Sequence, residues 1–180
     1  WEKSDITVCY LFDGSILTAF VNDTVYITED TSIITAFLSG SIKKRTFSAK
    51  PHYRYCLENG CELRNLITDG EICAYILNPT TSEYTIDRLC VTYHIAYPNG
   101  KYADISVLNA LCDAMEKLAD EQDQTELYKM ELRLTEVLAS MEHTGVKTDK
   151  KGVKEFGVYL SEQIEEMEQL VYDEAGHKFK

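Results

Sequence analysis

The sequence ITVCYLFDGSILTAFVNDTVYIT, residues 6–28, decides the fold class of the N-terminal part of the chain. It contains three runs rich in Val, Ile, Tyr, Phe and Thr, at 6–12, 16–21 and 24–28, separated by Asp-Gly-Ser and Asn-Asp. β-branched and aromatic residues favour strands, and short turns of Asp, Asn and Gly join antiparallel neighbours. The pattern therefore predicts a three-stranded meander.

Helix and strand signals alternate after the meander. Asp30 can cap a short helix, because its carboxylate can accept hydrogen bonds from the free N–H groups of the first turn. A short β-like run follows at 45–48, and helices are predicted from Lys50, from Asp69 and around 84–91. This alternation predicts an α/β domain in which helices flank a mixed sheet.

Two amphipathic helices are predicted in the C-terminal third, where apolar side chains recur every three or four residues. The first carries Leu127, Met130, Leu134, Val137 and Met141, and the second carries Val153, Phe156, Leu160, Ile164, Met167 and Val171. Gly145 separates the two helices, and Gly176 ends the second. Because the composition changes near Gln122, we expect one domain at 1–121 and a helical segment at 122–180.

The overall charge restricts the partners that the chain can bind alone. It has 30 acidic and 18 basic residues, a net charge of −12 at pH 7. An acidic surface repels phosphate backbones, so we expect weak or no DNA binding by this segment itself. No apolar run approaches the ~18 residues of a membrane span, and the start at Trp1 has neither an initiator Met nor a secretory signal. We therefore expect a piece of a longer cytoplasmic chain without membrane contact.

The six cysteines include no C-x-x-C pair. The absence of such a pair argues against a structural zinc site, and the lack of a secretory signal argues against stable disulfides. Buried, reduced thiols are therefore the expected state. The short basic run Lys43, Lys44 and Arg45 is interpreted as a solubilising edge rather than a DNA-binding track.

Two stretches carry recognisable motifs. The first is AKPHYRYCLENGCELRNLITDGEICAYILNP at 49–79, continuing to TIDRL at 85–89, and the second is LTEVLASMEHTGVKTD at 134–149, with the later Gly176. The first resembles the middle of the exonuclease domain of the bacterial family A DNA polymerases, the DNA polymerase I family, and the second resembles the start of their polymerase domain. The resemblance implies a ribonuclease-H-like 3′–5′ exonuclease fold at 1–121, followed at 122–180 by the helical base of the polymerase thumb.

The resemblance also tests whether the exonuclease site is present. In the family, four carboxylates hold two divalent metals that activate water and stabilise the leaving oxygen. Here His52 stands at the position of one metal-binding Asp and Tyr102 at another, while Asp13 and Asp104 could be remnants of the set. With at most two of four carboxylates left, we expect no catalytic residue, no metal site and no cofactor site in this segment.

The resulting prediction is an inactive exonuclease-like domain that acts as a scaffold in a DNA polymerase of replication and repair. The parent nucleotidyltransferase is expected to use Mg²⁺, to bind DNA and thereby associate with the nucleoid, and to pack against this segment. One alternative is an active metal-dependent 3′–5′ exonuclease that uses Asp13, Asp104 and His52. Another alternative is an acidic protein-interaction module unrelated to polymerases.

Overall fold

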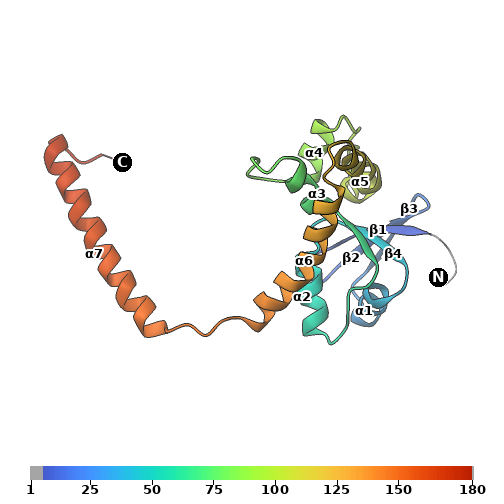
Figure 1. Cartoon of the computed structure of the whole chain (residues 1–180), viewed down its shortest axis with the longest axis horizontal. Coiled ribbons are helices and arrows are strands. Elements are labelled where there is room, and N and C mark those ends of the chain that lie inside the picture. Colours follow the sequence, from blue (N-terminus) through green and yellow to red (C-terminus); the bar gives the residue numbers. More distant parts are fainter. Residues whose placement is uncertain (1–5, 180) are drawn as a thin grey trace. The chain divides into compact units, whose positions relative to one another are not determined.

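The strand-forming runs of the sequence assemble into one sheet in the computed structural model, which describes residues 6–179 (Figure 1). The strands are β1 (Thr7–Phe12), β2 (Leu17–Val21), β3 (Thr24–Thr28), β4 (Lys43–Thr46) and β5 (Leu66–Asp69). The sheet order is β3-β2-β1-β4-β5. β1, β2 and β3 form the predicted antiparallel meander, whereas β4 runs parallel to β1 and β5 parallel to β4. The α/β prediction with a mixed sheet is therefore confirmed.

Seven helices accompany the sheet in the described part of the chain. They are α1 (Thr31–Ser39), α2 (Lys50–Glu58), α3 (Gly70–Leu77), α4 (Ile86–Thr92), α5 (Ala103–Glu121), α6 (Thr125–Thr144) and α7 (Lys150–Ala175). Aspartate caps begin two of these helices. The predicted cap Asp30 accepts from the N–H groups of Ser32 and Ile33, and Asp149, which was not predicted as a cap, accepts from the N–H of Lys151.

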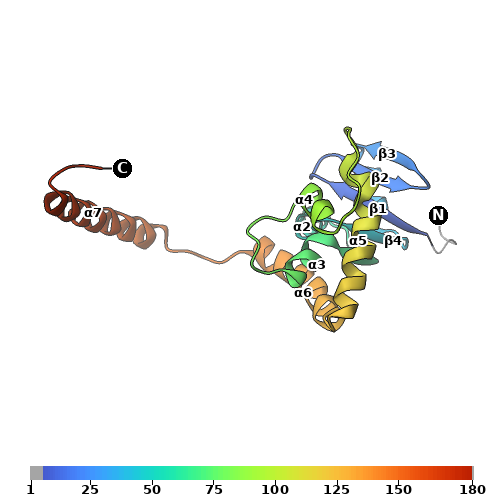
Figure 2. The same ribbon diagram turned by 90° about the horizontal axis from the view of Figure 1, so that it is seen from above.

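Alternate side chains of β1 enter two different cores, as the two-residue period of a strand requires. Val8 and Tyr10 face α1 and α2, where Ile34 and Cys56 are also buried. Cys9 lies on the opposite face in a core formed largely by α3, α4 and α5. The sheet thus lies between two helical layers. Figure 2 shows α5, which belongs to the layer on the Cys9 face.

α6 joins the two helical layers, because it contacts α2 from one and α3 from the other. Tyr128, Thr135 and Ala139 are its buried residues. The first compact unit accordingly extends to Thr144, and a second unit begins at Gly145. This division into compact units does not test the domain boundary expected near Gln122, which stays a prediction.

The second unit consists of α7 and its flanking residues. The predicted apolar stripe is present, and its members Val153, Phe156 and Met167 are each more than half exposed. The helix ends at Gly176, whose φ of 72° is left-handed and therefore suits glycine. Across residues 6–179, none of the helices combines the length and the apolar character that crossing a membrane would need.

Candidate functional site

Asp13, the first proposed remnant of the carboxylate set, lies in the turn between β1 and β2. One of its carboxylate oxygens accepts hydrogen bonds from the N–H groups of Ser15 and Ile16, both at 2.8 Å. These bonds lower the pKa of Asp13, and the bond from Ile16 has the larger effect. The residue is therefore a turn-stabilising aspartate with its side chain folded back on its own backbone.

His52, the second position inferred from the sequence, is 2% exposed in the first turn of α2. Its Nε2 lies 3.0 Å from the carbonyl oxygen of Phe12, and its Nδ1 lies 3.0 Å from the Tyr10 hydroxyl. Because a carbonyl only accepts, Nε2 carries the proton and Nδ1 accepts from Tyr10. Burial lowers the pKa of His52 to about 4, so the imidazole is neutral at pH 7. Both ring nitrogens are thus hydrogen-bonded to residues of β1, and neither is free to bind a metal.

Aromatic rings fill the space around this imidazole. The Tyr10 ring meets Phe37 edge-on at a centroid distance of 5.3 Å, and Phe12 meets Tyr55 in the same way at 4.7 Å. Both β1 rings also contact His52, at 5.2 and 5.6 Å. Such pairs stabilise by about 0.5–1.5 kcal/mol each beyond the area they bury. The face of β1 below α2 is a packed core and not an open polar cleft.

Tyr102 and Asp104 lie at the beginning of α5. Tyr102 is the N-cap residue, and the Lys101 ammonium lies 5.4 Å from its ring centroid. The Asp104 carboxylate accepts from the Tyr97 hydroxyl at 2.6 Å, and this bond raises the pKa of Tyr97 to about 12. Each of the four positions inferred from the sequence has partners of its own. Within the described residues, no three His, Cys, Asp or Glu side chains gather as a group that could hold a metal ion.

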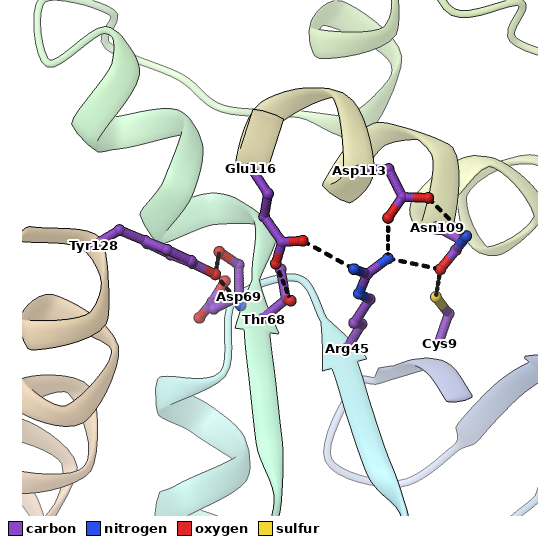
Figure 3. A network of polar contacts seen from close by, with 8 residues as sticks. All are labelled: Cys9, Arg45, Thr68, Asp69, Asn109, Asp113, Glu116 and Tyr128. Carbon is purple, nitrogen blue, oxygen red and sulfur yellow. Dashed lines mark hydrogen bonds and ion pairs between the residues drawn. The ribbon is translucent and has the colours of Figure 1, made fainter. Parts of the chain in front are cut away.

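A polar cluster that was not predicted from the sequence joins β4 to α5 (Figure 3). The Arg45 guanidinium donates to Asp113 at 2.5 Å and to Glu116 at 2.9 Å, and Glu116 also accepts from the Thr68 hydroxyl. Asn109 accepts from Arg45 as well. Because Arg45 pairs with both carboxylates of the cluster, the cluster ties the sheet to α5 and offers no vacant ligand set.

The interpretation of the basic run as a solubilising edge is wrong for two of its three residues. Arg45 has only 14% of its side chain exposed and lies in the cluster described above. Lys44 is fully buried, and its ammonium donates to the carbonyls of Gly40, Ile42 and Arg64 at 2.7–3.0 Å. These three acceptors match the three N–H donors of a lysine, which is how the buried charge is tolerated.

Asp69 is a second feature that sequence reasoning described only in part. A helix was predicted to begin here, and Asp69 caps α3. Its carboxylate also accepts from the N–H groups of Ser48 and Ala49 at the start of α2. The Tyr128 hydroxyl of α6 accepts from the Asp69 N–H at 2.9 Å (Figure 3). Burial raises the pKa of Asp69, while its three N–H donors oppose that shift. One side chain thus connects α2, β5 and α3, and its backbone connects them to α6.

Comparison with known proteins gives one consistent set of relatives. The chain is 27% identical to DNA polymerase I of Geobacillus stearothermophilus over 168 residues, 80% of this chain and 19% of that protein. It is 27% identical to DNA polymerase I of Caldicellulosiruptor bescii over 94% of this chain and 20% of that protein. The Bacillus subtilis DNA polymerase I is 30% identical over 76% of this chain and 18% of that protein. The chain therefore spans about a fifth of the length of these relatives.

A solved structure supports the fold. The polymerase domain of Pol1 from M. smegmatis, in complex with DNA primer-template and dNTP, superposes with a TM-score of 0.71 at 21% identity. The match covers 96% of this chain and 34% of that chain. No protein-family model matches this sequence.

Proposed function

The chain is related over most of its length to a segment of bacterial DNA polymerase I, and from this premise we propose that it is a non-catalytic scaffold of such a polymerase. Residues 1–121 form a degenerate 3′–5′ exonuclease-like domain. Residues 122–180 form the helical start of the polymerase domain, at the base of the thumb. The role of the segment is to support the polymerase that it belongs to.

The sheet supports this assignment. Its antiparallel meander, two added parallel strands and helices on both faces are compatible with a ribonuclease-H-like exonuclease fold. The strand order also puts β1 in the middle, with α1 and α2 on one face and α5 on the other. This framework is intact although its expected ligand positions have changed.

The observation that carries the proposal is the arrangement of His52. Two-metal hydrolysis needs several ionised oxygen ligands that converge on an open site. At this position the side chain is neutral, buried and hydrogen-bonded through both nitrogens to Tyr10 and Phe12. A metal would have to break both bonds and expel the surrounding rings. The position contributes to the stability of the core instead of to catalysis.

The parent protein supplies the chemistry in this proposal. It extends DNA in replication and repair as a nucleotidyltransferase that uses Mg²⁺, and it binds DNA through surfaces outside this acidic segment. The net charge of −12 supports weak or no DNA binding by the segment itself. The segment packs against the rest of its own polymerase chain, and the polymerase is cytoplasmic and nucleoid-associated through DNA.

Metal-dependent stability provides a direct test of the proposal. We expect the same unfolding midpoint in millimolar Mn²⁺ as in a sodium salt of equal ionic strength. A ligand that binds the folded state at about 100 times its Kd would stabilise it by about 2.7 kcal/mol, which is easily detected by thermal unfolding. Stabilisation by Mn²⁺ that disappears in an Asp13→Ala/Asp104→Ala variant would favour the active exonuclease instead.

A further inference from the structure

The C-terminal end of α2 brings two cysteines together. Cys56 is 2% exposed in the last turns of the helix, whereas Cys61 follows the helix and is half-buried. The chain leaves α2 through Gly60, whose φ of 64° is left-handed. The Cys61 N–H then donates to the Cys56 carbonyl over 2.9 Å. A glycine in this conformation followed by this bond is the Schellman motif that ends many helices.

The motif accounts for the contact between the two side chains. The residue after the glycine commonly packs against the residue whose carbonyl accepts its N–H, and here both residues are cysteines. Burial, and then the hydrogen bond with the Cys61 thiol, raises the pKa of Cys56. The two thiols are therefore neighbours in the folded chain.

A small pocket gives access to this pair. It has a volume of about 130 Å³, and Cys56 and Cys61 line it together with Glu136 and Ser140 of α6. That volume exceeds the ~10–15 Å³ that a single water needs, so a small polar oxidant can enter. The chain's other cysteines, Cys9, Cys73, Cys90 and Cys112, are all buried. Cys61 is thus the most accessible thiol, and Cys56 is the thiol beside it.

We propose that Cys56 and Cys61 are a redox modification site that closes to a disulfide when the chain meets a hydroperoxide. The Cys61 thiolate attacks one peroxide oxygen and breaks the O–O bond, and the other oxygen leaves and is protonated to water or an alcohol. The sulfur of Cys56 then attacks the resulting sulfenic acid. The S–O bond breaks, the S–S bond forms, and the released hydroxide takes the Cys56 proton as water. Two thiols lose one electron each, and the peroxide gains two.

Buried thiols were expected at all six cysteine positions, and the half-buried Cys61 departs from that expectation. Sulfenic acids condense readily with an adjacent thiol, so the neighbour protects Cys61 from further oxidation. The Cys56–Cys61 disulfide would fix the C-terminal end of α2 beside α6, and α2 packs against that helix. A dithiol reductant would reverse the reaction, which suits a redox-sensing rather than a structural disulfide.

Mass spectrometry of the 180-residue chain after brief treatment with hydrogen peroxide tests the site. We expect the loss of two hydrogen atoms, one peptide pair linked through Cys56 and Cys61, and full recovery with dithiothreitol. In Cys56→Ser we expect no linkage, and Cys61 should be trapped as a sulfenic acid by dimedone. In Cys61→Ser both the linkage and the dimedone adduct at Cys56 should be absent.

Two outcomes would overturn the proposal. One is a wild-type chain in which the Cys61 sulfenic acid accumulates while Cys56 stays a free thiol. The other is a peroxide-induced disulfide between Cys56 and a different cysteine in Cys61→Ser, because that other cysteine would then be the reactive thiol. Circular dichroism of both serine variants before oxidation verifies that they are folded, so a lost linkage reports chemistry.

Discussion

Replacing Asp69 with alanine is expected to lower the free energy of unfolding by about 4 kcal/mol, because three N–H groups lose their acceptor at once. Two of these donors, from Ser48 and Ala49, begin α2, and the third, from Glu71, lies in the first turn of α3. A donor left without a partner costs about 1–3 kcal/mol where it is buried, as at Ala49, and less where it is partly buried, as at Ser48 and Glu71. Chemical denaturation monitored by circular dichroism measures the loss.

Asp30→Ala is the matched control for this prediction. Asp30 also caps a helix, but it is exposed, so water can replace its carboxylate. We expect Asp30→Ala to lower the free energy of unfolding by about 1 kcal/mol, the usual value for a lost N-cap. Equal losses in Asp30→Ala and Asp69→Ala would mean that the buried connection between α2 and α3 contributes nothing beyond ordinary capping.

Acid is expected to destabilise the fold through His52. Its pKa is about 4 in the folded chain, compared with 6.5 for an unperturbed imidazole, because burial disfavours the charged form. Between these two values the unfolded chain binds a proton that the folded chain does not. The stability contributed by neutral His52 is therefore complete above pH 6.5 and is lost as the pH falls towards 4. The loss in the free energy of unfolding amounts to about 3 kcal/mol, because each unit of pKa shift corresponds to about 1.36 kcal/mol.

The His52→Gln variant isolates this contribution. Its amide can donate to the Phe12 carbonyl without titrating, so the variant should be less stable at neutral pH but lose less on acidification. His143→Gln removes an exposed imidazole from α6 and serves as the control. If wild type and His52→Gln lose stability in parallel between pH 7 and pH 4, the imidazole is not held neutral by burial.

Local signals in the sequence were sufficient to predict most elements. Asp30 and Gly176 define helix ends through contacts within a few residues, and the structure has those ends. β5 was missed because Leu66–Asp69 is only four residues long and shows no clear alternation. Its place in the sheet is set by pairing with β4, and no local pattern encodes such a partner.

The candidate site was less predictable, because its contacts join residues far apart in the chain. The resemblance indicated that His52 replaces a carboxylate, but not that Tyr10 and Phe12, about forty positions earlier, would engage both of its nitrogens. Arg45 was misinterpreted for the same reason, since its partner Glu116 lies 71 residues away. A run of charges usually marks a solvated surface, and only the folded chain shows which members are buried.

The most direct test of the scaffold account is degradation of labelled single-stranded DNA by the chain in Mg²⁺ and then in Mn²⁺. The Asp13→Ala/Asp104→Ala variant, purified in parallel, measures any contaminating nuclease. The account predicts no cleavage by the wild-type chain above the level of this variant with either metal. Cleavage by the wild type that the variant lacks would show that the remaining carboxylates form a working site, and would contradict the account.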